Sequence, residues 1–483
     1  VPAAGGAARA VAPEGGRIVT DPALYPKAFR EAPMLAELVQ AGRLPPVAER
    51  VGADPLVVEP LSEIGRYGGS IRRAFIGPND QQNAARFAAG PDGFLYWDPE
   101  WRTLQPNIAR GFQVSPDGRV LTLHLRRGMR WSDGAPFTAD DVMFWYEDMY
   151  RHPAIIGRPS TSLQIDGQDV LVRKVDEATV EFVSPVPHPT LPELFAGYTD
   201  VGGQSLMGRQ GLGGYAPRHY LQRFHPKYAS EAALERDARA AGFANWAIRL
   251  KNRNDWLLNP ELPVVTPWRL TVPINRPDFA LERNPYAIWV DTAGNQLPYV
   301  DRLVHAYCAT AAVVNFKAAA GKLDFQDRHL HVSRLPFLLN NRRRSDYEVF
   351  LDPAAGADIG LRLNIGYDLD AEVGALLRSR DFRRALSLGV DRDAINETLM
   401  LGTGRPSASV PAPDSRYYPG AEWAQRWARL DVAEANRLLD RVGLTERDGR
   451  GFRQRRDGKG RLRLSCQVFV SHFDYPAVAE MIR

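Results

Sequence analysis

The chain contains little cysteine, with only Cys308 and Cys466 among its 483 residues. A disulfide-stapled fold needs many more cysteines, and a cysteine-ligated zinc site needs them at short, regular spacing. Both classes are therefore excluded. We expect two separate buried thiols, with a disulfide between them in an oxidising compartment as the open alternative.

Long apolar runs are also absent, because no stretch reaches the about 18 consecutive apolar residues of a membrane helix. The longest weakly polar run, His305–Phe316, contains Thr310 and Asn315 and favours a core strand that leads into a helix. Hydrophobic residues make up 44% and charged residues 24%, which is the composition of an ordinary globular protein. We expect a soluble chain that divides into several domains.

No large excess of one charge is present, since 61 basic residues against 57 acidic residues leave a net charge of +4. This balance is too mild to indicate nucleic acid binding. The dense basic stretch Arg450–Arg463 contains Asp457-Gly458 and leads to alternating leucines, so we expect a solvated hairpin there. We expect no nucleic acid partner.

Catalytic motifs are missing as well: the sequence has no His-Glu-x-x-His, Gly-x-Ser-x-Gly, Walker-type phosphate loop or Cys-x-x-Cys. Gly208–Gly214 is rich in glycine but follows no clear strand, which favours a flexible loop over a dinucleotide site. His329 and His331 could supply two metal ligands on one strand face, but no cysteine or carboxylate pair stands close by. We expect no catalytic residues, no cofactor and no metal, with a metal at these histidines as the weaker alternative.

The most informative segment that is present is Val114–Glu147. Ser115–Gly118 has the residues of a tight turn and precedes alternating leucines, which predicts a β-hairpin with one buried face. A second turn at Ser132–Pro136 leads to Thr138, a residue type that caps the first turn of a helix. The segment therefore predicts strand, strand, turn and helix, with Trp131 in the core beneath the second turn.

The helix after Thr138 has one apolar face. Its inward positions follow helical spacing and are Val142, Trp145, Tyr146 and Met149. Its expected solvent-facing positions are Asp140, Glu147 and Asp148. Adjacent carboxylates at such places have capping and solvation roles rather than catalytic ones.

Together with other matching segments along the chain, this segment resembles the family 5 solute-binding proteins of ATP-driven importers. That family includes receptors for oligopeptides, dipeptides and some nickel or oligosaccharide ligands. The other matching segments are Tyr67–Arg72, Gln105–Gly111, Asn284–Trp289, Gln296–Asp301, Gly321–Asp324 and Val390–Arg392. Several matching segments in the same order as in the family identify it far more specifically than one short motif does.

The resemblance implies an α/β, two-lobed periplasmic-binding-protein fold of type II with an extra subdomain. Its mixed sheets are flanked by helices and its lobes are linked by a hinge. The expected division has an N-terminal extension at 1–57, lobe I at 58–80 and 200–305, the extra subdomain at 81–199, and lobe II at 306–483.

The function that the resemblance implies is to bind a ligand without changing it chemically. An oligopeptide-like ligand would be held between the lobes and delivered to the membrane permease of an ABC importer. A receptor for an oligosaccharide or other organic solute is the alternative, favoured by the ten tryptophans. A non-transport enzyme or a secreted interaction protein is a further alternative. We expect a monomer.

The location is expected to be periplasmic or extracellular. The stretch from Val1 to Gly16 is rich in small residues, glycine and proline, which is typical of a mature end exposed by signal-peptide removal. A trimmed chain would look the same, and a lipid anchor stays open.

Candidate ligand contacts lie where core strands end. They are Phe75, Asn79 and Asp80 after the first core strand, and Asn364 and Tyr367 after an expected strand at Leu361–Leu363. Phe75 and Tyr367 could instead simply close the core. The candidate stacking platforms for an extended ligand are Trp97, Trp101 and Trp268.

The chain ends where the resemblance predicts the start of a helix, at Tyr475–Arg483. In peptide-binding relatives the aspartate that pairs with the ligand's α-amino group follows this point, and Asp474 does not match it. We therefore expect this chain to be less stable, or to bind more weakly, than one extended to the family's length.

Overall fold

The computed structural model describes residues 9–10, 15–83, 92–157, 159–196, 199, 201–204, 213–351, 356, 359–413, 415–468 and 475–482. The chain forms two compact units. The N-terminal unit consists of residues 13–310 and 322–326, and the C-terminal unit of residues 1–12, 311–321 and 327–483. The finer division into lobes and a subdomain stays a prediction.

The central sheet of the N-terminal unit is mixed and has the order β13-β14-β16-β4. Its strands are β13 Trp268–Val272, β14 Asp278–Arg283, β16 Arg302–Tyr307 and β4 Ser70–Phe75. β16 and β4 run parallel, from the pair Arg302 and Ser70 to the pair Tyr307 and Phe75. The core strand expected before Phe75 is β4, and the core strand expected at the start of His305–Phe316 is β16.

A second, antiparallel sheet has the order β11-β12-β8-β7. Its strands are β7 Ala109–Val114, β8 Val120–Leu125, β11 Leu171–Asp176 and β12 Thr179–Val183. β7 and β8 form the predicted hairpin around Ser115–Gly118, where Gly118 adopts φ +70 and the Gly118 amide donates to the Ser115 carbonyl. The leucines at alternate positions of β8 are buried, which confirms the one-faced pattern.

The capped helix after this hairpin is present but is not regular throughout. It begins as α4, Ala139–Met143, with a capping box in which the Asp141 carboxylate accepts from the Thr138 amide at 2.9 Å. It continues as the π-helix η2, Phe144–Tyr150. The wider π-turn rotates later side chains away from α-helical positions. The expectation that Asp148 faces solvent was wrong: Asp148 is 6% exposed and accepts from Lys227 Nζ at 2.7 Å.

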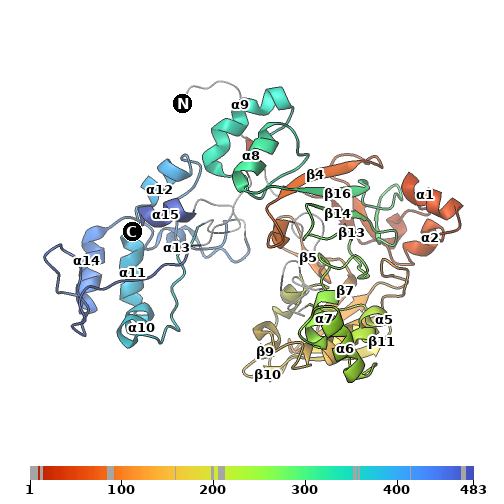
Figure 1. Ribbon diagram of the computed structural model, residues 1–483, viewed down its shortest axis with the longest axis horizontal. Helices are drawn as coiled ribbons and strands as arrows, with labels where there is room; N and C mark the ends of the chain where they lie inside the picture. The colour runs from red at the N-terminus through yellow and green to blue at the C-terminus, as the bar shows by residue number, and fades with distance from the viewer. Residues whose placement is uncertain are drawn as a thin grey trace. The chain divides into compact units, whose positions relative to one another are not determined.

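Smaller sheets and helices complete the N-terminal unit (Figure 1). The remaining strands are β2 Arg17–Val19, β3 Leu56–Glu59, β5 Leu95–Trp97, β6 Leu104–Pro106, β9 Gln164–Ile165, β10 Gln168–Asp169 and β15 Trp289–Asp291. The α-helices are α1 Pro33–Gln40, α2 Val47–Arg50, α5 Arg218–Leu221, α6 Glu231–Ala240 and α7 Trp246–Arg253. The 3₁₀ turns are η1 Pro22–Leu24, η3 Thr161–Leu163, η4 Leu191–Phe195 and η6 Gln222–Phe224.

A buried arginine attaches the first helices to this unit. The Arg50 guanidinium is fully buried, forms an ion pair with Glu31, and donates to the carbonyl of Pro285 and, at 2.9 Å, to Gln296 Oε1. Strand β3 pairs with both β2 and β15. The segment before residue 58 therefore contributes a strand and a buried charge to the N-terminal unit.

The C-terminal unit is mainly helical in its described residues. Its elements are β1 Arg9–Ala10, α8 Ala311–Ala319, η7 Val332–Arg334, α9 Leu335–Ser345, β17 Phe350–Leu351, α10 Ala371–Arg378, α11 Arg380–Leu388, α12 Arg392–Leu399, α13 Ala421–Gln425, α14 Val432–Arg441 and α15 Tyr475–Met481. The expectation of a strand at Leu361–Leu363 was wrong, because these described residues are not part of a strand and Leu361 is exposed. A short apolar alternation does not form a strand without a neighbour to pair with.

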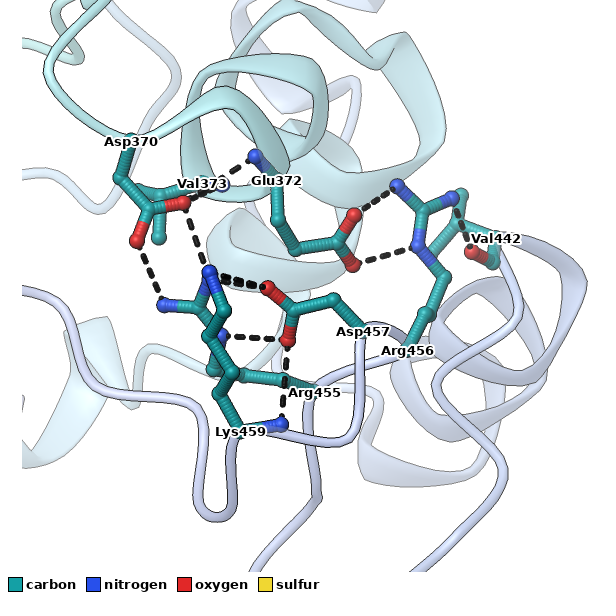
Figure 2. A network of polar contacts seen from close by, with 8 residues as sticks. All are labelled: Asp370, Glu372, Val373, Val442, Arg455, Arg456, Asp457 and Lys459. Atoms are coloured by element: carbon teal, nitrogen blue, oxygen red, sulfur yellow. Dashed lines mark hydrogen bonds and ion pairs between the residues drawn. The ribbon is translucent and has the colours of Figure 1, made fainter.

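The basic segment after α14 is tied to α10 by ion pairs (Figure 2). The Arg455 guanidinium contacts Asp370 at 2.7 and 3.0 Å and Asp457 at 2.6 and 2.8 Å. The Arg456 guanidinium holds Glu372 at 2.6 and 2.8 Å. Antiparallel bridges within 447–461 support the expected turns. The expectation of a solvated hairpin holds only in part, because the Arg455 side chain is only 12% exposed.

No helix in the described part of the chain is long and apolar enough to cross a membrane. Cys308 is buried and Cys466 is exposed, and no disulfide joins them. The expectation of two separate thiols is met, but only one of them is buried.

Candidate functional site

The candidate site lies at the carboxyl ends of β4 and β16 in the N-terminal unit. Because these strands are parallel and in register, Phe75 and Tyr307 end them side by side. Ligands of open α/β sheets bind outside the carboxyl ends of the strands. The loop that follows β4, Ile76–Asn83, and the segment Lys322–Gln326 complete this edge.

The segment Lys322–Gln326 is held against β4 by side chains rather than by regular strand pairing. The Asp324 carboxylate accepts from the Arg72 amide at 2.7 Å and from its guanidinium at 2.7 and 2.9 Å. Gln326 Oε1 accepts from the Ala74 amide at 3.0 Å. This attachment places Phe325, which lies between Asp324 and Gln326, next to the end of β4.

Below this edge the groups are buried and braced. Asp80 is buried and accepts from the Ile76 amide and Asn83 Nδ2, each at 3.2 Å. Asn83 Nδ2 also donates to the Ala74 carbonyl at 2.6 Å. These bonds fix the loop after β4 in one conformation, so Asp80 acts here as a brace of that loop.

The buried charge at the site belongs to Arg73. Its guanidinium donates to Asn83 Oδ1 at 2.7 Å and lies 5.2 Å from the centre of the Phe325 ring. Burial, and then the Arg73 charge, lower the pKa of His305 to about 3. The neutral His305 ring stacks on Phe279 with centroids 4.4 Å apart. The floor of the site is therefore aromatic, with one cation.

The sequence-predicted residues of this edge occupy different layers. Phe75 is 1% exposed and packs edge-on against Phe279 and Tyr307, at 5.6 and 6.0 Å. Asn79 is exposed in the loop above it. Ligand contact by Phe75, Asn79 and Asp80 stays a prediction.

Two exposed rings were missed by the sequence reasoning. Tyr307 is 50% exposed and Phe325 is 51% exposed, although both are large and apolar. Their signal in the sequence is position: Tyr307 ends a core strand, and Phe325 directly follows the matching segment Gly321–Asp324. The rings stand next to the carboxyl end of β4, where a ligand could stack on them.

A second aromatic group lies in the loop between β5 and β6. Trp97 and Trp101 stack with ring centroids 6.3 Å apart and planes 21° from parallel. Trp101 is 56% exposed and adopts φ +57, an unusual conformation for a bulky residue. Asp98 fixes it, because its carboxylate accepts from the amides of Arg102 and Thr103 at 2.7 and 2.9 Å.

The other predicted contacts are placed separately. Trp268 is half-buried against the main core of the N-terminal unit. Asn364 and Tyr367 belong to the C-terminal unit, where Asn364 is exposed and its Oδ1 accepts from the Gly366 amide at 3.1 Å. Tyr367 packs against the apolar cluster that contains Leu376 and Phe382. Ligand contact by these three residues also stays a prediction.

The sequence offered two weaker candidate segments, the histidines at 329 and 331 for a metal and Gly208–Gly214 for a nucleotide. No group of three or more His, Cys, Asp or Glu side chains there could hold a metal ion. His329 and His331 do not share a strand face, because His329 is buried in a turn at φ +67. Most of Gly208–Gly214 lies outside the described residues.

Comparison with known proteins gives one family and several relatives. Residues 103–483 match the model of the bacterial extracellular solute-binding proteins, family 5 Middle. The chain is 30% identical over 468 residues to the periplasmic alpha-galactoside-binding protein of Rhizobium meliloti (strain 1021), covering 88% of this chain and 61% of that protein. It is 23% identical to the periplasmic oligopeptide-binding protein OppA of Salmonella typhimurium, over 73% of this chain and 57% of that one. The chain thus spans less than two thirds of these relatives.

Solved structures show the same architecture. An oligopeptide-binding protein OppA superposes with a TM-score of 0.67 at 34% identity, covering 89% of this chain and 66% of the other. The periplasmic binding protein MelB of Agrobacterium fabrum C58, in complex with stachyose, gives a TM-score of 0.68 at 24% identity, covering 100% of this chain and 71% of the other. This likeness confirms the predicted α/β periplasmic-binding-protein fold.

Proposed function

Because the chain belongs to the family 5 bacterial extracellular solute-binding proteins, we propose that it is the ligand-capturing receptor of an ABC importer. It acts outside the cytoplasm, binds an organic solute without changing it, and passes the solute to a membrane permease. The supporting observation is a set of exposed aromatic rings on a braced framework, at a strand edge where open α/β sheets bind ligands.

The ligand class that the geometry supports best is an oligosaccharide. The apolar faces of sugar rings pack on flat aromatic side chains, and Trp97 with Trp101 forms such a flat surface. The backbone of Trp101 is held in a conformation that costs about 1–3 kcal/mol, and such strain clusters at ligand sites. The alpha-galactoside-binding relative and the stachyose-bound neighbour point to the same class.

An oligopeptide is the second candidate ligand. It is favoured by the OppA structure at 34% identity. A peptide would bind as an added strand, with main-chain hydrogen bonds and tolerant side-chain pockets. Affinity for a peptide would then depend little on any single aromatic platform, whereas affinity for a sugar would depend strongly on Trp101.

Isothermal titration calorimetry distinguishes the two ligand classes. The purified chain is titrated with the α-galactosides raffinose and stachyose, and separately with a mixture of tri- to pentapeptides. The oligosaccharide proposal predicts saturable heats with the α-galactosides and none with the peptides. The reverse result would replace the sugar by a peptide and keep the receptor role. Hydrolysis of either ligand during the titration would contradict that role.

A further inference from the structure

The C-terminal unit contains an open pocket whose lining includes none of the residues assigned above to the solute. Its volume is about 470 Å³, which suits a small organic molecule. All of its walls come from one part of this unit: α11, the segment around 408–410, and α13 with the turn that follows it. The lining residues are Arg380, Arg384, Ala408, Ser409, Val410, Trp423, Arg426 and Trp427.

The pocket carries an excess of positive charge. Arg384 lies 3.3 Å from the Asp381 carboxylate, and Asp381 also receives Arg441 at 3.3 Å. Among the described residues, Arg380 and Arg426 have no carboxylate partner. Two guanidinium groups therefore face the pocket with their hydrogen-bond donors available to an anion, and guanidinium groups match carboxylates in a bidentate geometry.

Two indole rings line the same pocket. Trp423 is 47% exposed, and the guanidinium carbon of Arg426 lies 4.7 Å from its ring centre. The guanidinium carbon of Arg384 lies 4.5 Å from the ring centre of Trp427. Each cation is thus oriented by an indole face before any ligand arrives. The pocket offers a charged end and flat apolar surfaces side by side.

The walls are tied to one another, so the pocket is preformed. Trp427 adopts φ +63, a strained conformation for a bulky residue, and Ser387 of α11 donates to its carbonyl at 2.8 Å. Arg392 donates to the carbonyl of Ala428 at 3.0 Å. The Ala408 amide donates to the Ala424 carbonyl of α13 at 2.7 Å. A preformed site loses little conformational entropy when a ligand binds.

The geometry points to a binding site for a small aromatic carboxylate. The carboxylate would pair with Arg380 and Arg426, and the ring would lie against Trp423 and Trp427. An aliphatic acid would forgo the stacking, and a neutral aromatic would leave the cations unpaired. This site does not depend on the receptor function, because its residues, the ligand class and its test are all separate from those of the solute.

Calorimetry with 2-naphthoate tests the site, with 2-naphthalenemethanol and acetate as the ligands that lack the charge or the ring. Binding of 2-naphthoate is expected, with both analogues at least about tenfold weaker. Equal binding of the alcohol, or no binding of 2-naphthoate at millimolar concentration, would overturn the inference.

Variants locate the binding. Arg426→Gln and Arg380→Gln should each weaken 2-naphthoate about tenfold, the usual effect of losing a charged hydrogen bond. Arg405→Gln is the matched control: Arg405 is an exposed arginine of the same unit that does not line the pocket, and its replacement should change nothing. If Arg380→Gln fails to fold, the 2-naphthoate affinities of Arg426→Gln and Trp423→Leu test the site instead. Affinities equal to that of Arg405→Gln would reject the site.

Discussion

Trp97 and Trp101 stack across the turn between β5 and β6, with ring centroids 6.3 Å apart and planes 21° from parallel. One ring is half-buried and the other is mostly exposed, so the pair forms a supported platform rather than two mobile side chains. A supported aromatic face is what a sugar ring needs, because little side-chain entropy is lost when the sugar binds.

Trp101→Ala should weaken oligosaccharide binding about five- to tenfold, because one stacking contact contributes roughly 1 kcal/mol. Its melting temperature should stay close to that of the parent chain, because the Trp101 side chain is mostly exposed. Calorimetry with stachyose measures the affinity. Tyr417→Ala is the control for the loss of an exposed aromatic ring and should leave stachyose binding unchanged. An equal loss of affinity in both variants would contradict the role of Trp101 as a stacking platform.

Replacing the buried Arg50 by Met should destabilise the chain by about 3 kcal/mol, because one partner of a buried ion pair is removed and its other acceptors lose their donor. Urea unfolding of the parent and the variant measures this. Arg17→Met is the matched control: the Arg17 side chain is 75% exposed in its pair with Glu59. Its loss should cost less than about 1 kcal/mol. Equal costs would mean that Arg50 does not hold the first helices in place.

Asp92 should make the N-terminal unit less stable as the pH rises. Burial raises the pKa of Asp92 to about 7. The hydrogen bond that its carboxylate accepts from the Tyr96 hydroxyl lowers this pKa, but by less than burial raises it. A carboxyl whose folded pKa is raised binds its proton more tightly in the folded state. Its contribution is therefore complete below the usual aspartate pKa near 4 and is lost as the pH rises through about 7. Asp92→Asn should lack this loss.

Urea unfolding at pH 5 and pH 8 provides the comparison. The parent should lose more stability between these two values than Asp92→Asn does, and identical losses would contradict the assignment. Other groups titrate equally in both proteins, so the difference isolates residue 92.

The ion-pair network of the C-terminal unit should give the opposite dependence on pH. Hydrogen bonds from Arg455 lower the pKa values of Asp370 and Asp457, and those from Arg456 lower the pKa of Glu372. Stability from these groups is present above their usual pKa values near 4 and is lost as the pH falls below them. Arg455→Gln should therefore lower the melting temperature at pH 7 and have little effect near pH 2.

Arg429→Gln provides the comparison for this network, because the Arg429 side chain is 75% exposed in its ion pair with Asp431. Thermal melting of both variants across pH 2–7 should show a strong pH-dependent difference only for Arg455→Gln. A difference of the same size at every pH would mean that Arg455 acts through packing and not through charge.

The sequence predicts best where the interactions are local. The turn at Ser115–Gly118 and the cap at Thr138 depend on residues within a few positions, and both are present. The expectation that Asp148 faces solvent was wrong because the helix continues as a π-helix, and packing around the helix sets this continuation. The expected strand at Leu361–Leu363 failed because strand formation depends on a distant partner.

The candidate site was harder to predict than the fold. Phe75 and Tyr307 are both aromatic and pair in register at the ends of β4 and β16, yet Phe75 is buried and Tyr307 is half exposed. The difference arises because Phe75 packs within the main apolar core, to which Tyr307 does not belong. Asp324 and Gln326 hold the segment around Phe325 against β4. Their partners on β4 are Arg72 and Ala74, each 252 residues away in the sequence. No local pattern encodes such a contact.

The receptor role is tested most directly by native mass spectrometry of the gently purified chain, followed by identification of the released small molecules. The account predicts a one-to-one complex with an unmodified organic solute, and an oligosaccharide in particular. A retained peptide would keep the receptor and change its ligand. A chain that carries no solute, and that takes up neither added α-galactosides nor peptides, would contradict the central claim.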